Sequence, residues 1–197
     1  IRAAQLEIAE VCVCLGPHVF RGSRIKKVEA SFMETFESPN CAPLIDFSRE
    51  IHTADHRIVR RKRTLDYKPE FDANVNLLTV YPGMPQSFLD AVLSSGPHGI
   101  VLRTYGPGML SADLFPWLQQ VTERKIPIVI TSQALRGKVD LHKYRKQLTL
   151  EQLGIISGKD MTFECALVKL MWALTQAKTP LRIRDLMERS LVGELDD

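Results

Sequence analysis

The sequence predicts an α/β protein in which a small parallel sheet is flanked by helices, in a three-layer arrangement. Three short segments are almost continuous apolar runs, as strands covered on both faces are: residues 75–81, 99–105 and 126–131. Between them lie two segments with apolar side chains at helical spacing, 86–94 and 113–125. Strand, helix, strand, helix, strand at this spacing calls for right-handed crossovers and hence a parallel sheet.

The residues before this regular pattern are harder to assign. Residues 2–9 contain strong helix formers with apolar positions three to four apart, which predicts a helix. The β-branched, cysteine-rich run 11–15 predicts a buried strand, and the basic loop RGSRIKK at 21–27 follows it. Residues 48–72 have few periodic apolar positions and predict an exposed linker or a partly extended strand.

Three helices are expected after the third strand. A short one is predicted at 150–153. A long one should run to Thr175 from a cap at Asp160 or Thr162, and its apolar positions on all sides indicate deep burial. The last, amphipathic helix is predicted at 181–191.

Composition places the chain among ordinary globular proteins. Apolar residues make up 45% and charged residues 25% of the 197 residues, and the net charge of +3 is too small to indicate nucleic-acid binding. No apolar run approaches the ~18 residues of a membrane span, and no signal peptide is recognisable. The basic run 60–63 is compatible with a nucleic-acid or localisation patch, but a solvated linker is favoured because no aromatic platform accompanies it. A cytoplasmic protein is expected.

Common cofactor and metal motifs are absent. The sequence has no GxGxxG, Walker, HExxH or CxxC motif. Its four cysteines are expected to be reduced thiols. His52 and His56 have i, i+4 spacing but no further ligand nearby, so no metal site and no cofactor are expected. The turn at 106–108 could bring backbone N–H groups to an anion, although a simple strand-end turn is the commoner meaning.

Six blocks of sequence carry a family resemblance. In order, RGSRIKK, TFESPNCAPL, LTVYPG, GIVLRTYGPG, IPIVITSQALRGKVD and GIISGKDMTFECALVKLMWAL resemble the L-asparaginases, most closely the type I or cytosolic kind. The match extends over nearly the whole chain to the terminal GELDD, and SGKDMTFECALVKL is its most specific part. The resemblance implies a larger amino-terminal α/β domain that carries a catalytic threonine, and a smaller carboxy-terminal domain with a parallel sheet.

The resemblance also implies how this chain divides. Residues 1–47 would be the remnant of the amino-terminal catalytic domain, 48–72 a linker and 73–197 the whole carboxy-terminal domain. The family's threonine signatures, TGGTI and HGTDT, do not occur in the sequence. The chain is therefore expected to be the carboxy-terminal part of a longer enzyme, to lack the nucleophile and to be inactive alone.

One catalytic residue follows from the resemblance. In the family, the last basic residue of the loop after the strand belongs to a threonine–lysine–aspartate group, and the matching position is Lys27. A lysine in a desolvated, charged setting can help to activate a hydroxyl group. Lys27 would thus balance the proton and the charge of the threonine hydroxyl as this threonine attacks the side-chain amide of L-asparagine. Without the resemblance, it would be assigned as a solvated lysine beside Lys26 and Arg24.

Further positions concern substrate and effector binding. The family usually has asparagine where this chain has Met109, which cannot supply the polar contact made to a neighbouring subunit's active site; Ser111 is a candidate substitute. Some type I enzymes bind an effector asparagine near an arginine that corresponds to Arg103. Lys26 and Ala134 would flank this effector here. Arg103 is equally compatible with a structural arginine that pairs with a carboxylate.

Three functions remain open. The first is an amidohydrolase of asparagine catabolism that converts L-asparagine to L-aspartate and ammonia, assembled as a homodimer or homotetramer. The second is an amidotransferase subunit that releases ammonia for tRNA-dependent amidation. The third is a non-catalytic asparaginase-like module. Threonine signatures in a preceding segment would support either of the first two.

Overall fold

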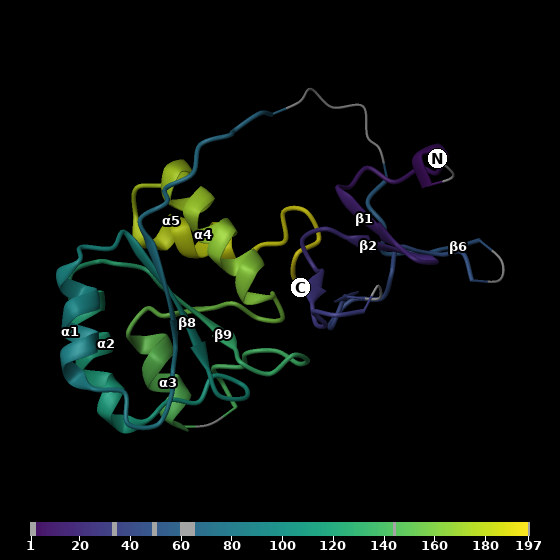
Figure 1. Cartoon of the computed structure of the whole chain (residues 1–197). Coiled ribbons are helices and arrows are strands. Elements are labelled where there is room, and N and C mark those ends of the chain that lie inside the picture. Colours follow the sequence, from purple (N-terminus) through teal and green to yellow (C-terminus); the bar gives the residue numbers. More distant parts are fainter. Residues whose placement is uncertain (1–2, 33–34, 49–50, 60–65, 144, 197) are drawn as a thin grey trace. The chain divides into compact units, whose positions relative to one another are not determined.

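The computed structural model of the chain describes two compact units (Figure 1). The first unit comprises residues up to 68 together with 190–196, and the second comprises 69–189. The described residues are 3–32, 35–48, 51–59, 66–143 and 145–196. The predicted domain limits, 1–47, 48–72 and 73–197, remain a prediction, because compact units need not coincide with the domains of a longer protein.

A four-stranded parallel sheet forms the centre of the second unit. Its strands are β7 (Val75–Thr79), β8 (Gly99–Thr104), β9 (Ile128–Ser132) and β10 (Ile156–Ser157), and their order in the sheet is β10-β9-β8-β7. Neighbours in the sheet are therefore also neighbours in the sequence. The predicted α/β class and parallel sheet are confirmed.

Helices cover both faces of this sheet (Figure 1). On one side lie α1, α2 with its short 3-10 lead-in η2, and α3; on the other side α4 contacts β7, β8 and β9, and α5 packs against α4 and β10. Their bounds are α1 Gln86–Ser94, η2 Ala112–Leu114, α2 Phe115–Glu123, α3 Arg145–Gln152, α4 Phe163–Gln176 and α5 Pro180–Glu188. The three-layer arrangement follows from this.

Trp117 on α2 is the largest fully buried side chain of the second unit. Its ring packs in the core between the sheet and the α1–α2 layer, and its Nε1 donates to the Leu89 carbonyl of α1 at 2.9 Å. The alternation of strand side chains places Ile100 and Leu102 in the same core. A single side chain thus contributes apolar area and also joins two helices.

Helix α4 corrects one expectation. Thr162, not Asp160, caps its start, because the Thr162 Oγ1 accepts from the Cys165 N–H at 3.2 Å. The expected burial on all sides is wrong: Val168 is 51% exposed. The buried face instead includes Lys169, whose Nζ donates to the Met187 and Arg189 carbonyls at 2.8 and 2.7 Å. These bonds satisfy carbonyl groups at the end of α5.

The first unit is built from short antiparallel strands. Strands β1 (Cys12–Leu15), β2 (His18–Arg21), β5 (Ile45–Asp46) and β6 (His52–Thr53) form one sheet in the order β1-β2-β5-β6. Strands β3 (Lys26–Lys27) and β4 (Phe36–Glu37) form a separate pair. The basic run 60–63 lies outside the described residues.

The expectations for the first residues are partly wrong. A helix was expected over 2–9, but the described residues 3–9 contain only a 3-10 turn, η1 (Ala3–Gln5). The side chains of Leu6 and Ile8 pack against a small core around Val19, so tertiary contacts override helix propensity. Residues 12–15 do form a strand, but β1 is an edge strand and Val11 before it is 86% exposed, so the expected burial is wrong. No helix among the described residues is long and apolar enough to cross a membrane.

Candidate functional site

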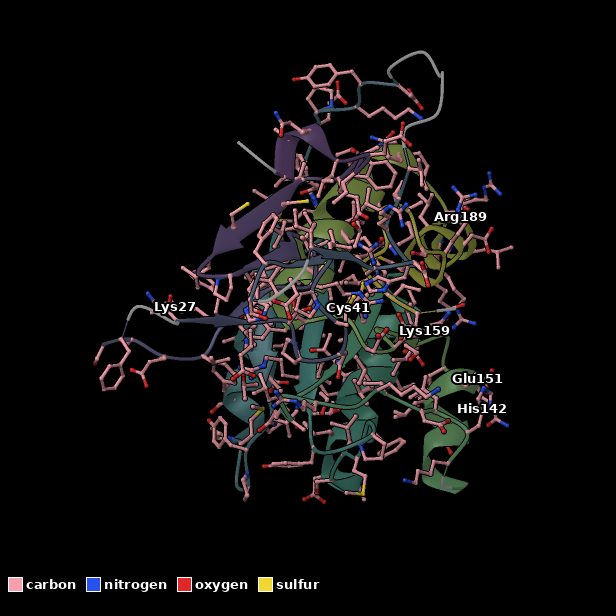
Figure 2. The ribbon with its side chains drawn as sticks, turned by 90° about the vertical axis from the view of Figure 1, so that its right-hand side faces the viewer. Lys27, Cys41, His142, Glu151, Lys159 and Arg189 are labelled. Atoms are coloured by element: carbon pink, nitrogen blue, oxygen red, sulfur yellow. The ribbon has the colours of Figure 1, made fainter. Side chains whose placement is uncertain are left out.

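Lys27 lies on β3 in the first unit (Figure 2). Its backbone pairs with Phe36 of β4, and its Nζ lies 5.8 Å from the centroid of the Phe36 ring. This is a cation–π distance, and the Lys27 side chain is exposed. Lys26 lies opposite Glu37 in the same pair of strands. The ammonium group of Lys27 is therefore accessible to groups from outside the described chain.

The turn that leads into β3 is tightly packed. The Gly22 N–H donates to the Val11 carbonyl at 2.9 Å, and a Cβ on Gly22 would lie only 2.9 Å from that oxygen. The Arg24 N–H donates to the Arg21 carbonyl at 3.0 Å. Arg24 itself is buried, with 2% of its surface exposed. Glycine is required at position 22 by close backbone approach.

Arg21 is held by a buried ion pair. Its Nη2 donates to the Glu10 carboxylate at 3.0 Å and to the His56 carbonyl at 2.9 Å, and its Nε donates to the other Glu10 oxygen. Glu10 also accepts from the Ile58 N–H at 2.6 Å. Burial alone would raise the pKa of the Glu10 carboxyl. The hydrogen bonds from Arg21 and Ile58, with the charge of Arg21, nevertheless bring that pKa below its usual 4.5.

This pair predicts acid sensitivity in the first unit. Because the folded pKa of Glu10 is lowered, its contribution to stability is complete above its ordinary pKa of 4.5 and is lost as pH falls through the folded value. Near neutral pH, the free energy of unfolding of the wild-type protein should therefore be larger than that of the Glu10→Gln variant. The difference in unfolding free energy should narrow as the pH falls below 4.5, because the Glu10 carboxyl then takes up a proton. Urea denaturation over this range measures it; a constant gap would contradict the prediction.

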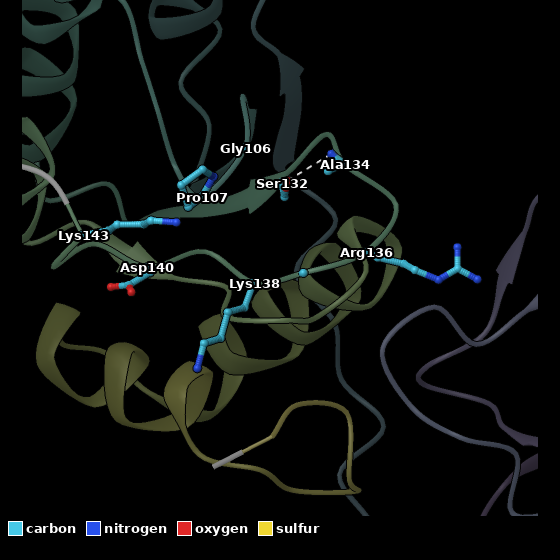
Figure 3. Close-up of a pocket in the computed structure, with 9 residues that line it drawn as sticks. Gly106, Pro107, Ser132, Ala134, Arg136, Lys138, Asp140 and Lys143 are labelled. Carbon is cyan, nitrogen blue, oxygen red and sulfur yellow. Dashed lines mark hydrogen bonds between the residues drawn. The ribbon is translucent and has the colours of Figure 1, made fainter.

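The second unit has a pocket outside the carboxyl ends of β8 and β9, where ligands of parallel α/β sheets usually bind (Figure 3). Its volume is about 360 Å³. The Ser132 Oγ accepts from the Ala134 N–H at 3.0 Å and so fixes the start of the loop after β9. The pocket is lined by Gly106, Pro107, Ser132, Ala134, Arg136, Gly137, Lys138, Asp140 and Lys143.

The cations of this pocket do not gather around one point. Figure 3 shows the Arg136 side chain extending away from Lys138 and Lys143. Asp140 adds a negative charge, and its Oδ1 accepts from the His142 N–H at 2.9 Å. The pocket is a polar crevice rather than a convergent anion site.

Arg103 and Ala134 both belong to the second unit but have different surroundings. Ala134 lines the pocket, whereas the Arg103 guanidinium lies 4.1 Å from the centroid of the Phe163 ring and its Nη1 donates to Thr79 Oγ1 at 3.4 Å. The Gln133 Nε2 donates to the Arg103 carbonyl at 3.1 Å and so joins the two segments. Lys26, the third expected effector residue, belongs to the first unit.

Met109 closes the turn after β8. Its N–H donates to the Tyr105 carbonyl at 2.8 Å, and its side chain is 46% exposed. The Ser111 hydroxyl, considered as a substitute, donates to Asp113 at 3.3 Å. Ser111 and Tyr105 line a second cavity of about 390 Å³. The position that departs from the family pattern is thus on the surface, beside a cavity with polar groups.

Metal-binding and thiol chemistry can be assessed for the described part of the chain. Within it, no three His, Cys, Asp or Glu side chains lie close enough together to hold a metal ion. All four cysteines lie in the described part of the chain, and none of them forms a disulfide. The Cys41 Sγ lies 3.5 Å from His56 Nε2, a contact the sequence spacing did not indicate. Burial raises the pKa of the Cys41 thiol, which disfavours the thiolate.

The fold and site define an α/β domain with a crevice at the carboxyl ends of its strands, joined to a smaller antiparallel unit that carries the lysine loop. Residues 74–187 match the family model for the glutaminase/asparaginase C-terminal domain, and residues 1–59 match the model for the asparaginase N-terminal domain. The chain belongs to the asparaginase family.

Solved structures agree with this assignment. The thermostable L-asparaginase from Thermococcus kodakarensis matches with a TM-score of 0.88 and 31% identity, over 95% of this chain and 58% of that chain. L-asparaginase I from Vibrio cholerae O1 biovar eltor matches with a TM-score of 0.86 and 30% identity, over 96% of this chain and 58% of that one.

Curated relatives carry more than one name. A glutamyl-tRNA(Gln) amidotransferase subunit from Sulfolobus acidocaldarius is 34% identical over 90% of this chain and 41% of its own length. The 60 kDa lysophospholipase from Homo sapiens is 35% identical over 99% of this chain and 35% of its own length. The chain thus spans less than half the length of these relatives.

Proposed function

We propose that this chain is a portion of a type I L-asparaginase, a cytoplasmic amidohydrolase that converts L-asparagine to L-aspartate and ammonia in asparagine catabolism. The observation that carries the proposal is the similarity over 95% and 96% of the chain to two proteins named L-asparaginases. The position of Lys27, on an exposed strand directly after a rigid turn, supports a role at a site completed by another segment.

In the proposed reaction, a threonine from a segment preceding this chain attacks the side-chain amide carbon of asparagine. The C–N bond breaks, ammonia leaves with the proton from the threonine hydroxyl, and water then hydrolyses the acyl-enzyme ester. Lys27 provides positive charge beside the reacting threonine and takes part in the proton balance. By itself the chain is inactive, because it lacks the threonine signatures.

An ammonia-release assay with intact-mass measurement tests this function. The full-length protein should release ammonia from L-asparagine, and the polypeptide of 22.3 kDa alone should not. L-glutamine as a second substrate defines the amide preference. Release by the 22.3 kDa chain alone would show that the nucleophile has been misassigned. No release by the full-length protein would contradict hydrolysis of asparagine.

An amidotransferase subunit is the second candidate. The amidotransferase relative from Sulfolobus acidocaldarius, at 34% identity over 90% of the chain, favours it. In that function the ammonia would be used by a partner enzyme to amidate glutamyl-tRNA. Ammonia release that rises on addition of the partner and glutamyl-tRNA would support it. A full-length protein that lacks the threonine signatures and hydrolyses no amide would instead indicate a non-catalytic module.

We further propose that Arg103, Lys26 and Ala134 take part in binding an effector asparagine. The Arg103 Nε is buried and has no hydrogen-bond partner among the described residues, so its N–H can donate to an acceptor on a ligand. Rate against L-asparagine concentration should then be sigmoidal for wild type and hyperbolic for Arg103→Ala. Identical curves for the two proteins would exclude this effector role.

A homodimer or homotetramer is proposed for the full-length protein. Family members place active sites between domains of different subunits, and Met109 lies on the surface beside a cavity. Light scattering at micromolar concentration should give at least twice the monomer mass. A monomer mass would contradict the proposed assembly.

A further inference from the structure

A segment near residue 193 returns to the first unit after the last helix of the second. Helix α5 ends at Glu188, and residues 190–196 belong to the first unit. The buried Glu194 carboxylate accepts from the Leu191 N–H at 3.0 Å and from the Val192 N–H at 2.8 Å, which closes a turn. Leu195 is also buried. The segment 193–196 is thus a packed part of the first unit rather than a loose tail.

The turn at Gly193 presents its carbonyl to two arginines. The Gly193 oxygen accepts from the Arg24 Nε at 2.8 Å and from the Arg21 Nη1 at 3.1 Å, and Arg24 Nη2 also pairs with the Asp196 carboxylate. Gly193 has φ +77°, and a Cβ there would lie 2.5 Å from the Arg21 guanidinium carbon. Only glycine allows this approach without displacing the arginine.

These two arginines bracket the turn that leads to the proposed catalytic lysine. Between them stand Gly22 and Ser23, and Lys27 follows Arg24 by three positions. The planar guanidinium of Arg24 donates in two directions at once, to a backbone carbonyl and to a carboxylate. The turn before β3 is therefore held both by the backbone of Val11 and by segment 193–196.

We propose that segment 193–196 is a positioning element for Lys27, and that Arg24 is the positioning residue through which it acts. This inference rests on the proposed function of Lys27. A displacement of about 1 Å in a reacting group can lower a rate by about 100-fold. The hydrogen bonds of Arg24 can thus affect the turnover rate although Arg24 itself does not touch the substrate.

Two variants of the full-length protein test the inference. Arg24→Lys keeps the charge but cannot donate to both Gly193 and Asp196, and Gly193→Ala displaces the Arg21 guanidinium. In both, hydrogen exchange should rise in residues 22–28 and stay unchanged in β7 of the second unit. The kcat for L-asparagine should fall by up to about 100-fold with little change in KM. Arg182→Lys, at an exposed arginine of α5, is the matched control and should behave as wild type.

The readouts separate this inference from the proposed function. If wild type releases no ammonia, the proposed function fails, and exchange in 22–28 still tests whether segment 193–196 holds the turn. Unchanged exchange there in both variants would overturn the positioning role. Faster exchange in 22–28 with wild-type kcat would likewise overturn it, because the turn would then be loosened without consequence for Lys27. If one variant does not fold, the other gives the same two readouts.

Discussion

Lys27→Met in the full-length protein is expected to abolish L-asparagine turnover while the melting temperature stays nearly unchanged. Loss of a side chain that transfers a proton or stabilises charge in the transition state lowers the rate by about 100-fold or more. Stability should change by no more than about 0.5 kcal/mol, because the Lys27 side chain is exposed and its ammonium lies over a single ring, that of Phe36. Ammonia release and calorimetry measure the two effects.

The control for this variant is Lys178→Met, which removes a lysine of the second unit that is also exposed. It should retain wild-type turnover. Full activity of Lys27→Met would refute the catalytic assignment. A large drop in melting temperature with lost activity would indicate that Lys27 supports the β3–β4 pair instead.

Trp117→Ala is expected to destabilise the second unit by about 3–5 kcal/mol. The ring is fully buried between the sheet and the α1–α2 layer, so its removal loses apolar burial and leaves a cavity. The hydrogen bond of 2.9 Å from Trp117 Nε1 to the Leu89 carbonyl is lost as well. Urea denaturation followed by far-UV circular dichroism measures the effect.

Two comparisons define the contribution of Trp117. Trp117→Phe keeps an aromatic ring and should lose only about 1–3 kcal/mol, because the hydrogen bond to the Leu89 carbonyl is lost and the smaller ring fills less of the core. Leu181→Ala, on the exposed side of α5, should fall within about 0.5 kcal/mol of wild type. A loss below about 1 kcal/mol in Trp117→Ala would contradict the central position of this side chain.

The second unit could be predicted from the sequence because its elements are long and periodic. Helix α1 begins and ends where its apolar spacing predicts, at Gln86 and Ser94. Strand β8 ends one residue earlier than predicted, at Thr104. The buried face of α4 was harder to predict. A lysine in a helical pattern suggests a solvated face, but Lys169 is buried because its ammonium group donates to carbonyl groups at the end of α5.

The first unit was less predictable for two physical reasons. Several of its strands have two residues, too short for any period to appear, and the pairing of β2 with β5 joins distant segments. The burial of Arg24 could not be predicted, because its acceptor, Gly193, is 169 residues away in the sequence. The position of Lys27 was assigned by family resemblance, and its catalytic role stays a prediction.

The bonds to the Gly193 carbonyl also bear on the order in which the chain folds during synthesis. Arg21 and Gly193 are separated by 172 residues, whereas successive strands of the second unit are joined by single crossovers. Contacts over short separations can form while translation continues, but the bonds of Arg21 and Arg24 to Gly193 cannot form until residue 193 has left the ribosome. A ribosome that stops before residue 193 would release a chain in which Arg21 and Arg24 lack the Gly193 carbonyl as acceptor. Quality-control proteases would then act on a first unit that is incompletely packed.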